Sequence, residues 1–189
     1  MSHEKKWECE QAIPVARHLY DRLNRVAKEI CFAGSLRRQS PLVGDIELLY
    51  IPVFVEEDDP DDMFGTKEIN LTDREIEAMI SERVLEKRLS SSGKQIYGSK
   101  NKLLRHMESG IPVDLFAATE ECWFNMLVCR TGPSQSNIRL CTEAQKRGLK
   151  WNPYGPGFTC QSTGRVIPVE SEKEVFDIVG MEFVPPEYR

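Results

Sequence analysis

The chain has 189 residues, of which 40% are apolar, and its 25 Lys plus Arg against 30 Asp plus Glu give a formal net charge of -5. This composition is typical of a globular protein, in one domain or in two closely joined lobes. The negative charge argues against wholesale coating of nucleic acid, because phosphate binding depends on clustered Lys and Arg. No apolar run approaches the roughly 20 residues of a membrane span, so we expect no membrane association.

The N-terminal residues, MSHEKKWECEQ, are charged and lack the apolar core of a secretory signal. We therefore expect a cytoplasmic protein. The six cysteines are scattered without a CxxC pair, which predicts reduced thiols rather than a disulfide framework. The three histidines show no metal-binding spacing, which argues against a zinc site.

Apolar residues at steps of three and four predict a first helix over 13–28, with Pro14 in its first turn. Two buried strands are predicted next, over 30–33 and 46–55, joined by a polar loop with glycines at both ends. The acidic segment that follows, EEDDPDD at 56–62, predicts a solvated turn.

A second helix is predicted over 72–89, opened by the capping-box pattern Thr-Asp-Arg-Glu. The remaining elements are predicted as a turn at 90–93, strands around 96–97, 103–104 and 111–116, helices over 123–129 and 136–146 ending at Gly148, short strands between 153 and 169, and a last helix over 171–179. A break near 117–121 divides the chain into two predicted lobes, 1–118 and 119–189.

Three acids stand at the exposed positions of predicted strands. Asp45 and Glu47 flank Ile46 at the start of one strand, so alternation points both carboxylates to the same side. Asp114 has the same setting between two apolar residues of a later strand. Carboxylates side by side repel unless a divalent cation lies between them, and oxygen ligands are those that Mg2+ prefers. The pattern acid-apolar-acid is also common on half-exposed edge strands. The prediction of a magnesium site therefore depends on the combination of Asp45 and Glu47 with Asp114.

The loop between the first two strands has the chemistry of a polyphosphate site. Gly34 allows close approach of the backbone, Ser35 adds a hydroxyl donor, and Arg37 or Arg38 adds a forked cation. A triphosphate with two metal ions is the natural occupant of such a loop beside three acids. By itself, Gly-Ser followed by a basic pair is also a common surface turn.

The ordered motifs GS-x-RR, GDIE and PVDLF resemble the catalytic core of the DNA polymerase beta superfamily, the family X polymerases. The resemblance continues through Arg130-Thr131-Gly132, Asn137 and AQKRG to the ending SEKEVFDIVGMEFVPPEYR. It implies a mixed α/β (α+β) fold, with a polymerase beta-like nucleotidyltransferase palm sheet, flanking helices and a smaller C-terminal lobe that selects the nucleotide. We expect the minimal two-lobed form, without the N-terminal lyase domain of many relatives.

The resemblance also implies roles for individual residues. Asp45, Glu47 and Asp114 match the carboxylates that bind two Mg2+ ions, which Mn2+ is expected to replace, and Asp114 is the one closest to the primer hydroxyl. The residues that match nucleotide contacts are Gly34, Ser35, Arg38, Gly44, Thr131, Gly132 and Asn137, with Gly132 against the sugar and Asn137 against the base.

The sequence departs from the family pattern at several of these positions. The second carboxylate is Glu47 where aspartate is usual, and Cys129-Arg130 replaces the aromatic pair before Thr-Gly. Ile138 and Cys141 stand where relatives place cationic residues toward the template.

Residues 83–106 contain seven Lys or Arg against the single acid Glu86. They predict a track for a nucleic-acid backbone, with a solvated basic face as the alternative. The candidate contacts are Lys87, Arg88, Lys94, Lys100, Lys102 and Arg105. The three tryptophans are candidates for base stacking, although core packing is favoured for Trp123.

The leading hypothesis is a small DNA polymerase that adds a deoxynucleoside monophosphate from a deoxynucleoside triphosphate to a primer 3′-hydroxyl. Its expected partners are the triphosphate and a primer-template or gapped DNA, and we expect a monomer. A second hypothesis changes the acceptor to RNA, protein or a small molecule, without a template. A third is an inactive nucleotide- or DNA-binding module with the same fold.

Overall fold

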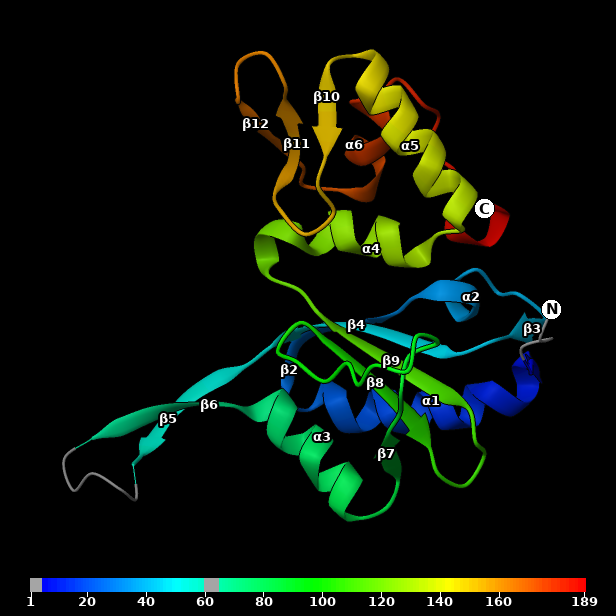
Figure 1. The fold of residues 1–189 in the computed structure, drawn as a ribbon, viewed down its shortest axis with the longest axis vertical. Coiled ribbons are helices and arrows are strands. Elements are labelled where there is room, and N and C mark those ends of the chain that lie inside the picture. The colour runs from blue at the N-terminus through cyan, green and yellow to red at the C-terminus, as the bar shows by residue number, and fades with distance from the viewer. Residues whose placement is uncertain (1–4, 60–64) are drawn as a thin grey trace.

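The computed structural model describes residues 5–59 and 65–189. Its centre is a five-stranded sheet in the order β2-β4-β9-β8-β7 (Figure 1). The strands are β2 (Ala27–Phe32), β4 (Ile46–Pro52), β7 (Leu85–Lys87), β8 (Asn101–His106) and β9 (Pro112–Ala117). Only the central pair of this sheet, β4 and β9, is parallel, so the two strands run side by side in the same direction.

Helices cover both faces of this sheet. On one face α1 (Cys9–Asn24) and α3 (Leu71–Ser81) pack against Ile46, Leu48 and Val113, because alternate strand residues point that way. On the other face α4 (Trp123–Thr131) packs on Leu49 and Phe116. The acids predicted to be functional alternate with the first set of apolar residues, so they share the face that α4 covers.

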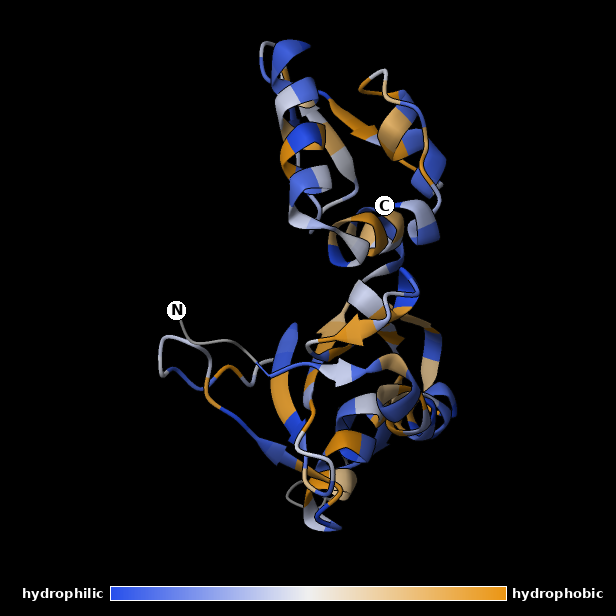
Figure 2. Cartoon of the chain, turned by 90° about the vertical axis from the view of Figure 1, so that its right-hand side faces the viewer, coloured by the Kyte–Doolittle hydropathy of each residue, from blue (hydrophilic) through white to orange (hydrophobic). Residues whose placement is uncertain are grey.

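A second core lies beyond α4. It joins α5 (Ser134–Lys146) and α6 (Glu172–Asp177) to a three-stranded antiparallel sheet of β10 (Leu149–Trp151), β11 (Gly157–Cys160) and β12 (Val166–Pro168). Two short 3-10 helices, η1 (Glu120–Cys122) and η2 (Pro186–Tyr188), begin and end this part. We call the elements up to β9 the N-terminal lobe and those from η1 onward the C-terminal lobe. Figure 2 shows the two stacked and joined through a narrow waist.

Smaller elements flank the central sheet. β1 (Trp7–Glu8) pairs with β3 (Leu42–Val43), and α2 (Gly34–Arg37) is a single turn between β2 and β3. β5 (Phe54–Asp58) and β6 (Thr66–Asn70) form a two-stranded ribbon that projects from the N-terminal lobe (Figure 1).

The mixed α/β fold class is confirmed, whereas several boundaries were wrong. The first helix begins at Cys9 and ends at Asn24, so Pro14 lies inside it rather than in its first turn. The predicted second helix ends at Ser81, and Leu85–Lys87 is a strand. Its N-cap is Asn70, whose side chain accepts from the Asp73 backbone N–H. The capping-box prediction failed because the Thr72 hydroxyl instead donates to the Val26 carbonyl, 2.7 Å away.

The strand predicted over 46–55 divides at residue 53 into β4 and β5, and β5 continues through Asp58. The front of the predicted acidic turn is therefore strand, while its residues 60–62 lie outside the described residues. Residues 96–97 make only an isolated bridge rather than a strand. The lobe boundary between 118 and 119 stays a prediction.

The helices over 123–129, 136–146 and 171–179 are confirmed within two residues at each end by α4, α5 and α6. All six cysteines are free thiols, as expected. Among the described residues, no helix combines the length and the apolar character that crossing a membrane requires.

Candidate active site

Two of the three predicted carboxylates lie opposite each other on the central parallel strands. Glu47 on β4 and Asp114 on β9 are register partners, and Asp45 stands just before β4. Their neighbours Ile46 and Val113 are fully buried in the core with α1, so the acids turn to the opposite face. The structure thus brings together acids from distant stretches of the sequence.

The local electrostatics of these acids favour a cation. Burial raises the pKa of Glu47 to about 8, and repulsion from Asp45 and Asp114 adds to the rise. Burial also raises the pKa of Asp114, against the attraction of Arg88. A raised carboxyl pKa means that the charged form lacks compensation, which a bound cation would supply.

Asp114 already has a cationic partner. The Arg88 Nη2 donates a hydrogen bond to Asp114 Oδ1, and the two side chains are only 18% and 13% exposed. Across residues 5–59 and 65–189, no three His, Cys, Asp or Glu side chains are grouped closely enough to hold a metal ion. Carboxylates of the type that binds magnesium are therefore present, but they are not grouped around a metal position, and Asp114 is bound to Arg88.

The predicted phosphate loop folds into α2, directly beside Glu47. Gly34 has a φ of +56°, and a Cβ there would lie 1.8 Å from Glu47 Oε2, so only glycine admits this close approach. The Ser35 hydroxyl oxygen is buried and has no hydrogen-bond partner, which leaves a donor for a phosphate oxygen. Gly44 stands next to Asp45 at the start of β4, where an added Cβ would meet nothing within 4 Å.

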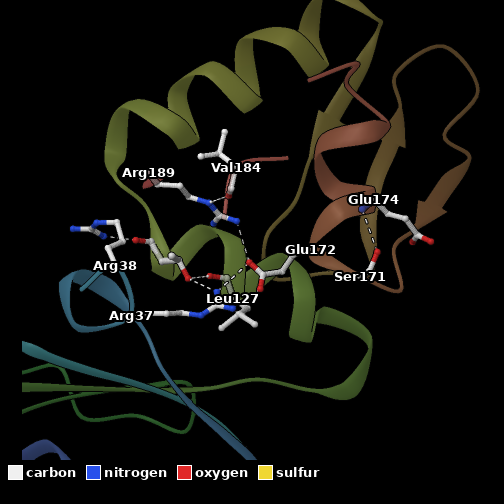
Figure 3. Close-up of polar contacts among 9 residues, drawn as sticks. Arg37, Arg38, Leu127, Ser171, Glu172, Glu174, Val184 and Arg189 are labelled. Carbon is white, nitrogen blue, oxygen red and sulfur yellow. Dashed lines mark hydrogen bonds and ion pairs between the residues drawn. The ribbon is translucent and has the colours of Figure 1, made fainter. Parts of the chain in front are cut away.

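The two arginines at the end of α2 reach across to the C-terminal lobe (Figure 3). Arg38 donates to the carbonyl oxygen of Thr131. Arg37 donates to Thr131 Oγ1 at 2.7 Å and to both carboxylate oxygens of Glu172. Arg189 Nη2 adds a 3.2 Å hydrogen bond to Glu172. We call Arg37, Thr131, Glu172 and Arg189 the interlobe cluster. The sequence did not predict it, because its members come from separate motifs far apart in the chain and only the fold brings them into contact.

The predicted nucleotide residues of the C-terminal lobe lie at the junction of α4 and α5. Thr131 is buried, and Gly132, with a φ of +61°, is close enough that its Cβ would contact Arg38 Nη1 at 3.4 Å. Asn137 Nδ2 donates to the Cys129 carbonyl at 2.8 Å, while its Oδ1 is buried without a partner. Gly132 therefore borders α2 across the lobe boundary, and Asn137 keeps one acceptor for a ligand.

Arg130 belongs to the motif Arg130-Thr131-Gly132, but the sequence assigned it no role in the site. Its guanidinium lies 3.7 Å from the Phe116 ring centroid and 5.6 Å from that of Tyr154. Its Nε is buried without a hydrogen-bond partner. Its charge opposes the rise in pKa that burial causes at both Glu47 and Asp114. Arg130 thus places a positive charge on α4 facing the carboxylates, where an aromatic residue was expected.

Comparison with known proteins shows which family and fold the chain resembles. Residues 126–189 match the family model described as DNA polymerase beta thumb. The chain is 27% identical over 184 residues to DNA polymerase/3′-5′ exonuclease PolX of Bacillus subtilis (strain 168), covering 94% of this chain. It resembles the crystal structure of Leishmania infantum polymerase beta in a ternary P/T complex, with a TM-score of 0.72 and 18% identity, over 98% of this chain and 77% of that chain. The chain is therefore similar to family X DNA polymerases, and its C-terminal lobe matches their thumb.

This polymerase beta-like chain spans 27% of the length of the Bacillus relative. The likeness to the Leishmania structure concerns the fold, and it extends over both lobes of the chain.

The predicted nucleic-acid contacts of this polymerase beta-like chain do not form one continuous track. Lys102 is 2% exposed and makes a 2.8 Å ion pair with Asp73, so it is not a surface contact as predicted. Lys87 lies over the Tyr97 ring, 3.8 Å from its centroid, and Arg88 is paired with Asp114. Four of the predicted residues are exposed to solvent, namely Lys87, Lys94, Lys100 and Arg105.

A cavity of about 460 Å³ opens beside the carboxylates. Its charged lining consists of Lys5, Arg88 and Arg105 together with Asp45, and Trp7 forms part of its wall. The Lys5 ammonium lies 5.0 Å from the Trp7 ring centroid. Of the three candidate stacking tryptophans, Trp7 is partly exposed, whereas Trp123 and Trp151 are buried.

The residues present fit a magnesium-triphosphate ligand. Glu47 lacks compensation for its charge, the Ser35 hydroxyl lacks a partner, and Gly34 keeps the turn close to the acids. For Asp114 to bind a metal ion through Oδ1, this oxygen would have to leave Arg88.

Proposed function

We propose that this chain is a metal-dependent nucleotidyltransferase, which adds a deoxynucleoside monophosphate to a primer 3′-hydroxyl and releases pyrophosphate. The observation that carries the proposal is the pairing of Glu47 with Asp114 on adjacent parallel strands. The carboxylates lie beside α2, whose Ser35 hydroxyl is buried and unpartnered. Phosphoryl transfer requires carboxylates that bind metal ions next to groups that donate hydrogen bonds to the phosphates.

Asp45, Glu47 and Asp114 would hold two Mg2+ ions, with Mn2+ as a substitute. Bound Mg2+ would lower the pKa of the attacking hydroxyl and offset charge on the reacting phosphate. Asp114 would take up the hydroxyl proton as the oxygen bonds to the α-phosphorus and the bond to pyrophosphate breaks. Ser35 would donate to a phosphate oxygen, which orients the triphosphate for in-line displacement.

The C-terminal lobe would select the nucleotide. Gly132 has no side chain beside α2, which leaves space for a sugar, and the unpartnered Asn137 Oδ1 can accept from a base. Primer-template or gapped DNA would contact the exposed Lys94, Lys100 and Arg105. We propose that the chain acts as a monomer, because both lobes that contribute site residues belong to one chain.

Incorporation of labelled deoxynucleoside triphosphates across several acceptors tests the proposal. We expect extension of gapped duplex DNA by the wild-type chain with Mg2+, and none by Asp45→Asn. The matched control is Asp177→Asn, because Asp177 lies on the exposed side of α6, paired with Lys173. Full incorporation by Asp45→Asn, or no incorporation on any acceptor by the wild type, would overturn the proposal.

A second candidate is template-independent transfer to another acceptor. It is favoured by α5, where Ile138 is 64% exposed and Cys141 is exposed, so neither position offers a cation to a template strand. In that case incorporation on single strands, RNA or no nucleic acid would equal that on gapped DNA. An inactive module, the third candidate, would bind Mg2+ and triphosphate in calorimetry without forming product.

A further inference from the structure

The ion pair between Arg88 and Asp114 occupies the position where the proposed function needs a metal ligand. Arg88 follows β7 at the edge of the sheet, whereas Asp114 lies on β9. Arg88 Nη2 donates to Asp114 Oδ1, so this oxygen already has a cationic partner. Among the described residues, no three acidic, Cys or His side chains are grouped closely enough to hold a metal ion.

Besides its bond to Asp114, the Arg88 guanidinium donates two hydrogen bonds, both to backbone carbonyls. Its Nε donates to the Leu104 carbonyl at 3.0 Å, and its Nη1 makes a long 3.4 Å hydrogen bond to the Leu89 carbonyl. The Nη2 bond to Asp114 joins one nitrogen to one oxygen, in contrast to the forked contact by which arginine binds carboxylates most tightly. The end of the side chain can therefore turn while the Nε bond keeps its stem in place.

Arg88 also lines the cavity that contains Lys5, Arg105 and Asp45. Three cations around one cavity repel one another, and a phosphate group between them would remove that repulsion. The cavity includes Asp45, so a strand bound there would lie next to the reacting acids. An acceptor strand, whose 3′-hydroxyl must reach these acids, has a phosphodiester group one nucleotide back from that hydroxyl.

We propose that Arg88 couples acceptor binding to assembly of the metal site. A phosphodiester of the acceptor strand enters the cavity and draws the guanidinium away from Asp114. Asp114 then faces Glu47 and Asp45 without its arginine, and the three acids together attract divalent cations. Without an acceptor, Arg88 occupies the position of a metal ion. It thereby prevents hydrolysis of the triphosphate when no acceptor strand is bound. This inference rests on the proposed function, and Arg88 is a positioning residue in it.

Binding of Mn2+ alone, followed by electron paramagnetic resonance, tests the inference without any turnover. We expect the wild-type chain to bind Mn2+ weakly, and to bind it about ten- to a hundredfold more tightly with a single-stranded or gapped DNA whose acceptor 3′ end is dideoxy. That range is what one hydrogen bond to a charged group contributes. Equal Mn2+ affinity with and without DNA would overturn the inference, and this arm needs no variant.

Arg88→Met should bind Mn2+ about tenfold or more tightly than the wild type without DNA, and adding DNA should change its Mn2+ affinity little. Arg88→Lys, which keeps the charge, should bind as weakly as the wild type. A merely structural role for Arg88 would leave the Mn2+ affinity of Arg88→Met unchanged or lower, and that result would contradict the proposal. The matched control is Arg105→Met, because Arg105 lines the same cavity but pairs with Glu86. It should weaken DNA binding and leave Mn2+ affinity without DNA unchanged.

Failure of the inference is distinguishable from failure of the proposed function. If the wild type incorporates nucleotides while DNA leaves Mn2+ affinity unchanged, the inference fails alone. If Mn2+ binding responds to DNA but no acceptor is ever extended, the proposed transfer reaction fails, while the exchange of Arg88 between two anions stands.

Discussion

Two arginine-carboxylate pairs of this chain are equally exposed but differ in their hydrogen bonding and surroundings. Arg37 with Glu172 and Arg88 with Asp114 are each 18% and 13% exposed. Arg37 contacts both oxygens of Glu172, and Arg189 and Thr131 support the pair from the same cluster. Arg88 contacts one oxygen of Asp114 and borders a cavity.

The difference shows that burial alone does not say what an ion pair is for. The interlobe pair has its hydrogen-bonding capacity filled by protein groups, so it joins α2 to the C-terminal lobe. The Arg88 pair stands among acids that repel one another and beside an open cavity, where the proposed exchange of partners would take place. We expect the first pair to stabilise the fold and the second to control the site.

Asp114→Asn should have the largest effect on activity and little effect on stability. The amide oxygen still accepts from Arg88, but the neutral side chain no longer attracts a metal ion, so incorporation should fall to background. The free energy of unfolding should stay within about 1 kcal/mol of the wild type. Labelled nucleotide incorporation and urea denaturation measure the two quantities, and retained incorporation would contradict the metal assignment.

Glu172→Gln should show the reverse behaviour. The change leaves Arg37 and Arg189 close together without a carboxylate, which should lower the free energy of unfolding by about 3 kcal/mol. The control on the same helix is Asp177→Asn, which removes an exposed pair with Lys173 and should cost less than about 0.5 kcal/mol. Equal costs for the two variants in urea denaturation would show that the interlobe cluster is not structural.

The pH dependence of stability separates the two regions further. The ordinary pKa of Glu47 is 4.5 and burial with neighbouring acids raises it to about 8 in the folded chain. Between these values the folded chain binds a proton that the unfolded chain has lost, so the free energy of unfolding falls as pH rises. Glu47→Gln should flatten this decline in metal-free buffer, whereas Glu172→Gln should keep it. Urea denaturation at pH 5 and pH 8 is the measurement.

Because Gly34 lies close to Glu47, we expect substitutions at these two positions to have non-additive effects on the free energy of unfolding. Gly34→Ala should cost about 1 to 2 kcal/mol, because φ is positive and the new Cβ meets the Glu47 carboxylate. Glu47→Asp shortens the side chain, so the double variant should recover about 0.5 to 1 kcal/mol of that loss. Additive costs would show that the two residues are independent. Glu47→Asp alone should lower incorporation, since the turn is shaped to admit the longer acid.

The smallest effect concerns a third buried pair, Lys102 with Asp73. Lys102 is not exposed, so Lys102→Met should leave the salt dependence of DNA affinity unchanged. Lys100→Met, at an exposed position, should reduce the log-log slope by about 0.9 if Lys100 contacts a phosphate of duplex DNA. A lower slope for Lys102→Met would place that residue at the DNA surface after all.

Much of the fold was predictable where local rules dominate. Alternation correctly directed Ile46 inward and its acidic neighbours outward, and the apolar period identified α4, α5 and α6. Prediction failed where a tertiary contact outweighed a local pattern. Thr72 matches a capping box, yet its hydroxyl bonds to the Val26 carbonyl and the helix starts one residue earlier. Residues 85–87 continue a helical period but form a strand, because β8 offers them hydrogen bonds.

The candidate site shows the same division. The acids and the Gly-Ser turn could be named from the sequence, because each follows a strand pattern or a backbone requirement. The protein partners of Arg37, Arg38, Arg88 and Lys102 could not, because the sequence predicted all four as contacts for phosphate groups of a ligand. Only the folded chain decides which of them meets an acid, a carbonyl or water.

The sequence alone determined the kinds of groups that this chain can bring to phosphoryl transfer, since residue type and alternation depend only on neighbours along the chain. The tertiary structure decided how those groups are paired. Parallel pairing of β4 with β9 places Glu47 opposite Asp114, and folding of β7 along β8 brings Arg88 to the same acid. Long-range pairing of this kind depends on how separate elements pack, and charge acts through space rather than along the chain.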